Sequence, residues 1–387
     1  MSKHGKRILL SRRSLIKAGS ALLGTGLLST SPLAQLNKSA SRSSPKKSST
    51  MMLITGGAGY IGSHTCVALL ESGCDLVVLD NLCNSSKKSL ARVEQITGKK
   101  LRFEQGDIRD PILLDKLFAR YPIDTVVHFA GLKGVAESVA DPLNYYNNNV
   151  FGSSVLFRAM QKARVNKIVF SSSATVYGQQ TILPVPETAT LSHASPYGHT
   201  KLMIEEMLDY IHKAEEQSGR PWGVALLRYF NPIGAHSSGL IGEDPWGIPN
   251  NLLPYITQVA AGIRPHINLY TGYDTRDGSG VRDYIHVVDL ARGHVKAIEK
   301  LQGVTGVYAW NLGVGQGYST FEVLDAFERG NKLTIPREIH GRRAGDVDSC
   351  YADVSKARKE LGWVAEHRLD DMVRDAWNWQ KKNPNGY

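Results

Sequence analysis

Tyr197 and Lys201 are the residues of this sequence best suited to acid–base chemistry. They lie four residues apart, just after Ser195-Pro196, where a helix is expected to start, so they would share one helix face. A tyrosine with a pKa near 10 becomes a base at neutral pH only if its phenolate is stabilised by about 4 kcal/mol. An ammonium about 5 Å away supplies roughly 3 kcal/mol at an effective dielectric of 20. The pair therefore predicts a base that needs a second positive charge nearby, although such pairs also occur by chance on many helices.

A glycine-rich stretch, Leu53 to Gly62, lies between an apolar run and a helix-forming segment. It contains Gly57, Gly59 and Gly62 in the spacing G-x-G-x-x-G, with Gly56 in front. In such a motif the first glycine permits a tight turn, the second lets a pyrophosphate approach the backbone, and the third lets the helix pack on its strand. The helix N-terminus adds unpaired N–H groups for the phosphates. The stretch predicts a dinucleotide-binding turn, although glycine loops also serve ordinary turns.

Asp80 would close the second strand of this fold, 18 residues after Gly62. A carboxylate there can accept hydrogen bonds from both ribose hydroxyls and would repel a 2′-phosphate, which favours NAD over NADP. The alternative is a turn or helix-capping aspartate. An oxidised nicotinamide would supply the second positive charge that the tyrosine and lysine require. Ser173, at the end of the fifth expected strand, could hydrogen-bond the reacting hydroxyl.

Strands and helices are expected to alternate from Met52 onward. Short runs rich in Val, Ile and Leu are separated by helical patterns, which indicates an α/β fold of the Rossmann type with a doubly wound parallel sheet. Ligands bind beyond the carboxyl ends of such strands, where Asp80, Asp107, Ala130-Gly131 and Ser171–Ser173 would share one edge. The expected strands are Leu53–Thr55, Leu76–Leu79, Leu101–Glu104, Thr125–Phe129, Lys167–Ser171 and Trp222–Leu227, and the clearest helices are Ser63–Ser72, Ser89–Thr97 and Pro111–Arg120.

The regular alternation is lost after Arg228, where a region rich in glycine and proline follows. We therefore expect an NAD-binding Rossmann domain over residues 51–230. A smaller α/β lobe over residues 231–387 would form the substrate cleft, with segments that return to the Rossmann core. Residues 1–50 would be a basic extension.

The positive charge of the chain is confined to that extension. Residues 1–50 contain ten Lys or Arg and no Asp or Glu, whereas the whole chain has 46 basic and 36 acidic residues. Residues 51–387 therefore have 46 − 10 = 36 basic and 36 − 0 = 36 acidic residues. The pI of about 9.3 describes a tail, and the balanced body argues against nucleic acid as a partner.

The extension resembles a twin-arginine export signal at Ser11-Arg-Arg-Ser-Leu-Ile-Lys17. The apolar stretch that follows, Ala18 to Leu28, is shorter than the roughly 20 residues that span a bilayer, so no stable membrane insertion is expected. The alternatives are a start of translation at Met51 or Met52, or a nonfunctional tail. The four cysteines have neither metal-ligand nor disulfide spacing, so no metal is expected and a cytoplasmic enzyme is favoured over an exported one.

The sequence resembles the extended short-chain dehydrogenase/reductase family, and within it the UDP-hexose 4-epimerases. The resemblance runs from Leu53 almost to Tyr387. Its motifs include T-G-G-A-G-Y-I-G-S-H-T (55–65), F-S-S-S-A-T-V-Y-G (170–178), S-P-Y-G-H-T-K (195–201), L-R-Y-F-N-P-I-G-A-H (227–236) and R-R-A-G-D (342–346). It implies reversible 4-epimerisation of UDP-glucose and UDP-galactose on tightly bound NAD, in galactose and nucleotide-sugar metabolism. Tyr197 would take the proton of the 4-hydroxyl, hydride would pass from C4 to NAD, and the 4-keto sugar would turn and accept it on its other face.

The same resemblance implies a homodimer and two sets of binding residues, besides Ser173, Tyr197 and Lys201 as catalytic residues. The cofactor set is Gly56, Gly59, Tyr60, Ile61, Gly62, Asp80, Asn81, Asp107, Ile108, Phe129, Ala130, Gly131, Lys133, Asn148 and Phe230. The substrate set is Asn231, Asn251, Leu252, Asn268, Tyr270, Arg282, Arg343, Asp346 and Cys350. Arg282 and Arg343 suit a diphosphate because guanidinium groups can bind it in a bidentate manner; the alternative is a surface ion pair.

Three departures from the pattern of this family affect its interpretation. Ala174 and Thr175 stand where sugar-nucleotide 4,6-dehydratases have Asp-Glu, so dehydration lacks its acid and base. The loop 270–278 is one residue shorter than usual, which puts its uridine contacts in doubt. Cys350 stands where some of these epimerases have a tyrosine beside the sugar, and a smaller residue there goes with room for an N-acetyl group. UDP-N-acetylhexosamines are therefore expected as further substrates.

Two other functions stay open from the sequence. One is the 4-epimerisation of another UDP-sugar, a uronate or a pentose. The other is a catalytically inactive NAD-sensing scaffold on the same fold, against which Ser173, Tyr197 and Lys201 argue.

Overall fold

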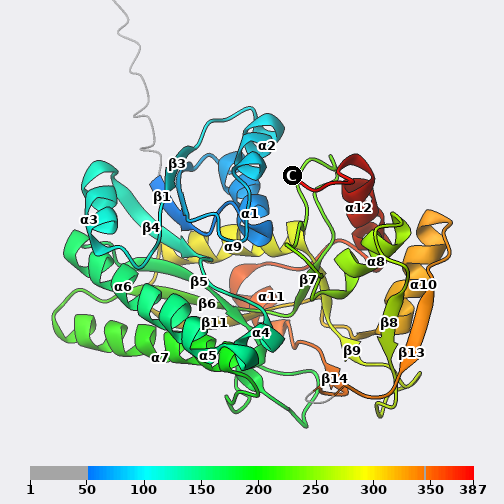
Figure 1. Cartoon of the computed structure of the whole chain (residues 1–387). Helices are drawn as coiled ribbons and strands as arrows, with labels where there is room; N and C mark the ends of the chain where they lie inside the picture. Colours follow the sequence, from blue (N-terminus) through cyan, green and yellow to red (C-terminus); the bar gives the residue numbers. More distant parts are fainter. Residues whose placement is uncertain (1–50, 344–345) are drawn as a thin grey trace, which may run out of the picture. The chain divides into compact units, whose positions relative to one another are not determined.

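A seven-stranded parallel sheet forms the centre of the protein, which was analysed as a computed structural model that describes residues 51–343 and 346–387 (Figure 1). Its strand order is β11-β6-β5-β4-β1-β2-β3, and every neighbouring pair is parallel. The strands are β1 Met51–Thr55, β2 Asp75–Asp80, β3 Arg102–Gln105, β4 Ile123–His128, β5 Lys167–Ser173, β6 Gly223–Tyr229 and β11 Gly306–Leu312. This confirms the predicted doubly wound sheet, and the first six strands lie within two residues of their predicted bounds.

Helices cover both faces of the sheet because the strands carry apolar side chains on both sides. The helices α1 Tyr60–Glu71, α2 Lys87–Thr97 and α9 Val287–Leu301 share one buried core with residues of the sheet such as Ile54 and Val78. The helices α3 Pro111–Arg120, α6 Gly152–Ala163 and α7 Pro196–Gln217 share the other core, with Leu53 and Val126. In Figure 1, α3, α6 and α7 lie in front of the sheet and α9 behind it.

Two helix starts differ from the prediction. Helix α1 begins at Tyr60 and not at Ser63, because the glycine turn leads directly into it and Gly59 is its N-cap. Helix α2 begins at Lys87 rather than Ser89, because the Ser86 side chain accepts a hydrogen bond from the backbone N of Lys88. Helix α3 has its predicted bounds; Asp110 caps its N-terminus and Pro111 is its first residue.

The chain after β6 forms short strand pairs packed on three helices. Strand β7 Asn231–Ile233 pairs with β10 Tyr284–His286, β8 Ile267–Tyr270 pairs with β13 Arg337–His340, and β9 Val281–Arg282 lies between β12 Tyr318–Ser319 and β14 Ser349–Cys350. The helices α8 Leu252–Ala260, α10 Thr320–Asn331 and α12 Leu369–Lys382 enclose a separate core. Helix α9, strand β11 and α11 Ser355–Leu361 pack with the Rossmann core. A division near residue 231 with returning segments therefore remains our proposal for the domain boundary.

Some predictions fall outside the described residues, namely those on the basic extension 1–50 and on positions 344 and 345 within R-R-A-G-D. Among the described residues, no helix combines the length and the apolar character needed to cross a membrane. Within residues 51–343 and 346–387, no three His, Cys, Asp or Glu side chains are arranged to hold a metal ion.

Candidate active site

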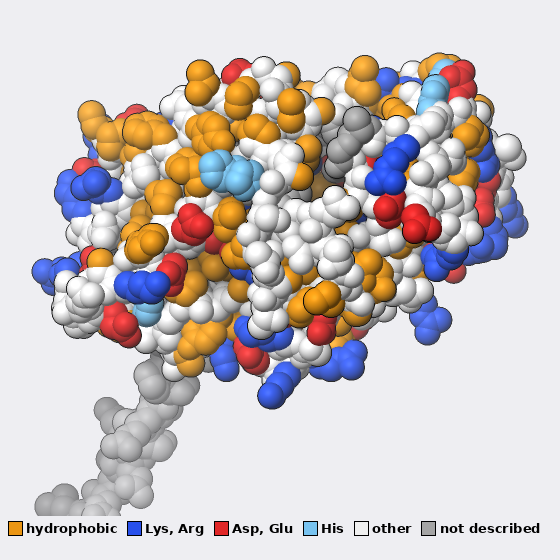
Figure 2. Space-filling model, turned by 90° about the horizontal axis from the view of Figure 1, so that it is seen from below, with side chains coloured by type: hydrophobic (Ala, Val, Ile, Leu, Met, Phe, Trp, Pro, Cys, Tyr) orange, Lys and Arg blue, Asp and Glu red, His pale blue; other side chains and the backbone are white. Residues whose placement is uncertain are grey.

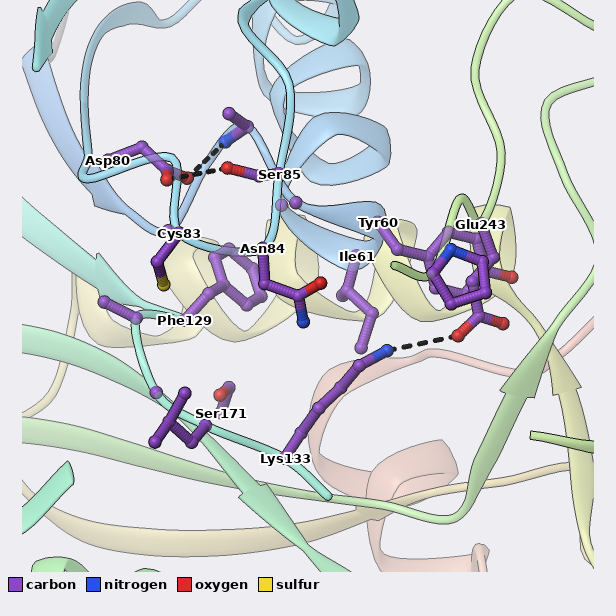
Figure 3. A pocket seen from close by; sticks show the side chains of 18 of the residues that line it. Tyr60, Ile61, Asp80, Cys83, Asn84, Ser85, Phe129, Lys133, Ser171 and Glu243 are labelled. Carbon is purple, nitrogen blue, oxygen red and sulfur yellow. Dashed lines mark hydrogen bonds and ion pairs between the residues drawn. The ribbon is translucent and has the colours of Figure 1, made fainter. Parts of the chain in front are cut away.

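One pocket lies at the carboxyl edge of the sheet, lined by the turns after β1, β2, β4, β5 and β6 and by the segment between β7 and α8 (Figure 3). It contains Ser173, Tyr197 and Lys201. All the predicted cofactor residues except Asp107 line it as well. Of the predicted substrate residues, Asn231 and Asn251 line it, and Leu252 follows directly at the start of α8. The structure therefore brings together predicted site residues that are up to 251 − 56 = 195 positions apart in the sequence.

The glycine turn after β1 needs glycine at specific positions. Gly56 has a φ of +72°, and a Cβ there would lie 2.6 Å from the backbone N of Ala130. A Cβ on Gly62 would lie 2.4 Å from the carbonyl oxygen of Gly56, so helix and turn could not approach as they do. A Cβ on Gly59 would lie no closer than 3.4 Å to another protein atom, and Gly59 lines the pocket. The positive φ of the turn falls at Gly56 and not at Gly57, but a Cβ on Gly57 would lie 2.8 Å from Val78 Cγ1, so this position also favours glycine.

Asp80 holds the loop after β2 in place. One carboxylate oxygen accepts from the backbone N of Ala58 at 2.9 Å, and the other accepts from the backbone N of Leu82 and from Ser85 Oγ, each at 2.9 Å. Figure 3 shows the bond to Ser85. Asp80 thus stabilises a turn, which was the alternative to a cofactor role, and its carboxylate also lines the pocket. Two roles are compatible, because a carboxylate has about four acceptor positions.

Asp107 is not part of the pocket lining and pairs with Arg109 at 2.7 Å. Hydrogen bonds from that guanidinium lower the pKa of Asp107 to about 2. Asn81 Nδ2 also donates to this carboxylate at 3.0 Å, while Gly106 and Ile108 on either side of Asp107 line the pocket. Asp107 therefore positions the wall here through Asn81 and Arg109.

The three predicted catalytic residues come from β5 and α7. Ser195 caps α7 by accepting from the backbone N of Gly198, which sets the first turn that carries Tyr197. Lys201, one turn later, is buried, and its Nζ donates to the carbonyl of Ser171 at 2.7 Å. The ammonium lies 5.9 Å from the centre of the Tyr197 ring, and Ser173 hydrogen-bonds the Tyr197 side chain. The predicted neighbourhood of hydroxyl, phenol and ammonium is present.

When only the side chains of the protein are considered, burial decides whether Tyr197 and Lys201 are charged. It raises the pKa of Tyr197 above 10, and the hydrogen bond from Ser173 lowers it only in part. Burial also lowers the pKa of Lys201 to about 8, although the nearby carboxylate of Glu205 acts in the opposite direction. The side chains of the protein therefore do not make a phenolate at neutral pH by themselves, which agrees with the need for a further positive charge inferred from the sequence.

The remaining predicted substrate residues form a group outside the pocket lining. Arg343 binds Asp346 through Nε at 3.0 Å and Nη2 at 2.9 Å, and its guanidinium lies 5.6 Å from the Tyr270 ring centre. Arg282 lies 3.9 Å from the same aspartate. The ion pair considered as an alternative is thus formed here. Asn268 is exposed and contacts His340 at 3.2 Å, and the His340 ring lies 5.8 Å from the Tyr270 ring.

Cys350 connects this group to the pocket. It pairs with Arg282 in the register of β14 and β9, and its side chain packs on a buried cluster that contains Phe230. Phe230 lines the pocket. Burial raises the pKa of the Cys350 thiol to about 11, so the side chain is a small neutral group packed on that cluster.

Comparisons with known proteins agree with this geometry. A family model described as GDP-mannose 4,6 dehydratase matches residues 53–376. UDP-glucose 4-epimerase of Pasteurella multocida (strain Pm70) is 56% identical over 338 residues, which are 87% of this chain and 99% of that protein. This chain belongs to the UDP-glucose 4-epimerase family.

Two solved structures of UDP-glucose 4-epimerases extend the comparison. The enzyme of Bifidobacterium longum, in complex with NAD+ and UDP, has a TM-score of 0.84 and 52% identity, and the match covers 87% of this chain and 100% of that chain. The UDP-Glc/GlcNAc 4-epimerase of Campylobacter jejuni has a TM-score of 0.74 and 34% identity over 86% of this chain and 99% of that chain.

Three residues that the sequence did not single out also shape this site of the family member: Asn149, which follows the lining residue Asn148 but is not itself part of the pocket lining, and two lining residues. Asn149 is buried; its Oδ1 accepts from the backbone N of Leu132 at 2.8 Å, and its Nδ2 donates to the Leu132 carbonyl and to Thr200 Oγ1. It therefore fixes the loop after β4 against α7. Glu243 and Tyr387 line the pocket. No local pattern marks any of the three, because each acts through contacts with distant segments.

Proposed function

We propose that this chain is an NAD-dependent UDP-glucose 4-epimerase that interconverts UDP-glucose and UDP-galactose. The observation that carries the proposal is the meeting of Ser173, Tyr197 and Lys201 with the Gly56–Gly62 turn and Asp80 in one pocket. A base without a bound redox partner could not invert a secondary alcohol, and a dinucleotide site without a base would lack proton transfer. Together they suit a reaction with no net redox change.

The residues of the pocket fit NAD. The turn at Gly59 and the N-terminus of α1 suit a pyrophosphate, Asp80 suits the adenosine ribose, and Lys133 adds a cation on the opposite wall. When bound, NAD would supply the acceptor and the donor for a reversible hydride transfer. Tyr197 takes the proton of the sugar 4-hydroxyl, Ser173 holds that oxygen, and Lys201 stabilises the phenolate. The sugar becomes a 4-keto sugar and turns about its link to the diphosphate, and Tyr197 returns the proton after reduction from the other face.

Dehydration is disfavoured, although the matching family model is described by that activity. Ala174 and Thr175 follow Ser173 in a short 3-10 helix over Ala174–Tyr177. Neither side chain can act as the carboxylic acid or carboxylate that expels water, and Thr175 Oγ1 is buried without a hydrogen-bond partner among the described residues. The site thus offers Tyr197 as its base and no second acid–base pair next to Ser173.

UDP-N-acetylhexosamines are proposed as further substrates because Cys350 is small. Purified protein should convert UDP-N-acetylgalactosamine as well as UDP-galactose, measured by coupled assay of the epimeric products. Cys350→Tyr should lower kcat/KM for the N-acetylated sugar by about 100-fold and leave UDP-galactose within about threefold. Cys350→Ser is the matched control, since it keeps the volume and should keep both activities. Turnover of UDP-galactose alone by the unmodified protein would contradict this substrate range.

The proposed homodimer rests on one exposed apolar surface. Side chains of α4 Val135–Ala140, α5 Pro142–Tyr145, the adjoining π-helical turn Tyr146–Phe151 and α7 contribute to it. Its members are Val135, Val139, Leu143, Phe151 and Tyr210, which are between 48% and 78% exposed. Figure 2, which views the molecule from the side where α5 and α7 lie in Figure 1, shows apolar groups interspersed with charged ones. Such a surface is typical of a subunit interface.

Turnover of UDP-sugars tests the proposal. We expect protein purified with its NAD to convert UDP-galactose to UDP-glucose, whereas a preference for a UDP-uronate or a UDP-pentose would assign a different substrate. NAD content with no turnover of any of these sugars would indicate the inactive scaffold.

A cytoplasmic location remains our prediction.

A further inference from the structure

The segment Asn383–Tyr387, which follows α12, packs on the segment between β7 and α8 that lines the pocket. Tyr387 makes three hydrogen bonds with it. The backbone N of Tyr387 donates to Asp244 Oδ2 at 2.9 Å. Its hydroxyl accepts from the backbone N of Gly242 at 3.2 Å and lies 3.3 Å from the Gly242 carbonyl, to which it can donate. Tyr387 itself lines the pocket.

Close packing fixes this contact further. The rings of Tyr387 and Trp379 lie 4.7 Å apart, and the Arg92 guanidinium from α2 lies 5.1 Å from the Tyr387 ring centre. A Cβ on Gly242 would lie 2.4 Å from Trp379 Cγ, so the backbone of the loop is in direct contact with the indole. The guanidinium also donates to the carbonyl of Leu240 at 2.9 Å. Helix α2, helix α12 and the segment that follows α12 therefore hold the same few residues of the loop.

The loop carries Glu243, whose side chain connects the two sides of the pocket. Its carboxylate accepts from Lys133 Nζ at 3.1 Å (Figure 3) and from Asn251 Nδ2 at 2.7 Å. The Glu243 side chain is only 8% exposed, and its backbone carbonyl accepts from Trp379 Nε1. Lys133 belongs to the predicted cofactor set and Asn251 to the predicted substrate set. The position of the Glu243 carboxylate thus sets the positions of one residue from the cofactor set and one from the substrate set.

We propose that Tyr387 is a positioning residue for the bound dinucleotide, acting through the loop at Gly242 and Glu243 on Lys133. This deepens the proposed function, on which the identity of the dinucleotide as NAD rests. Without the tyrosine side chain, the backbone N–H and carbonyl of Gly242 lose their hydrogen-bond partner. The loop that carries Glu243 then also loses one of the side chains that hold it. Lys133 is then no longer held at the pocket, and the dinucleotide leaves faster.

The test is the rate at which NAD leaves protein purified with NAD bound. Tyr387→Ala should release NAD at least about tenfold faster than the unmodified protein, since two hydrogen bonds and the ring packing are lost. At saturating added NAD, kcat for UDP-galactose should recover to within about threefold, because Tyr387 does not touch the reacting atoms. NAD release is read by fluorescence or by nucleotide analysis after gel filtration, and it does not depend on turnover. Failure of the proposed function would therefore appear separately, as absence of turnover in the unmodified protein.

Tyr308→Ala is the matched control. Tyr308 also packs against a tryptophan, Trp310, with ring centres 5.5 Å apart, and its hydroxyl also donates to a backbone carbonyl, that of Thr305 at 2.9 Å. It lies outside the pocket lining. The control should lose stability without faster NAD release. Equal NAD loss in both variants would reduce Tyr387 to a structural role and overturn the proposal.

Two further variants keep the test decisive if Tyr387→Ala folds poorly. Tyr387→Phe keeps the ring packing and removes only the bonds to Gly242, so it should show an intermediate rate of NAD release. Glu243→Gln combined with Tyr387→Ala should release NAD no faster than the faster of the two single variants, because both act on Lys133 by one route. An unmodified rate for Tyr387→Phe, or fully additive effects in the double variant, would contradict the route.

Discussion

Tyr197→Phe should lower kcat for UDP-galactose by about 10²–10⁴-fold, the contribution expected of a positioned proton-transfer group. The change removes one hydroxyl, which in the protein is hydrogen-bonded by Ser173. The backbone N of Tyr197 bonds Ser138 Oγ at 3.1 Å, and this contact does not involve the hydroxyl, so the helix start should be kept. NAD content and the unfolding midpoint should therefore stay close to those of the unmodified protein. The measurement is initial-rate kinetics together with nucleotide analysis of the purified variant.

Tyr146→Phe is the matched control for the loss of a hydroxyl. The Tyr146 hydroxyl bonds His199 Nδ1 at 2.8 Å, on the same helix as Tyr197, but Tyr146 does not line the pocket. Its removal should change kcat by less than about threefold. Full activity of Tyr197→Phe would eliminate the assignment of the base, whereas loss of both activity and NAD would indicate that the hydroxyl supports the fold of the pocket.

The sequence predicted the sheet and the centre of the site for one physical reason. Parallel strands end at a common edge, so Asp80, Ala130 and Ser173 had to meet there once the strands were located. Tyr197 and Lys201 followed from helix geometry, since four residues make about one turn. Both inferences use local patterns whose spatial consequence is fixed by the geometry of strands and helices.

What the sequence did not predict depends on contacts between segments without a shared pattern. Glu243 binds Lys133, 110 positions away, and the choice of this partner over Arg282 or Arg343 depends on loop paths that no periodicity describes. The turn role of Gly56 rather than Gly57 depends on the approach of Ala130. Burial raises the pKa of Tyr197. The argument from the sequence counted only nearby charges and therefore did not predict this direction.

Glu205→Gln should destabilise the protein by about 3–5 kcal/mol, because it leaves a buried guanidinium without its anion. Arg228 Nη2 lies 2.7 Å from Glu205 Oε2, and the two side chains are 5% and 4% exposed. Ser172 Oγ donates to the same carboxylate at 2.5 Å, and Arg228 Nη1 donates to the Tyr177 hydroxyl at 3.0 Å. The pair joins β5, α7 and β6 directly behind the pocket. Urea unfolding at pH 7 measures the loss.

Asp209→Asn is the control for this change, since it removes a carboxylate from the same helix. The Asp209–Lys213 pair is solvent-exposed, with 39% and 59% of the side chains accessible, so its loss should cost less than about 1 kcal/mol. A loss of similar size for Glu205→Gln and Asp209→Asn would contradict the importance of burial.

The double variant Glu205→Leu with Arg228→Met separates the two ways in which the buried pair can act. If the pair mainly avoids an unpaired charge, removing both members should recover much of the stability lost in Glu205→Gln. Activity should recover less, because Glu205 lies one helical turn after Lys201. Its partner Ser172 also lies directly between Ser171, whose carbonyl binds the Lys201 ammonium, and Ser173. Stability and kcat that recover together would mean that the pair supports only the fold. Recovered stability with kcat still reduced would mean that it also sets the positions of the ammonium and the serine.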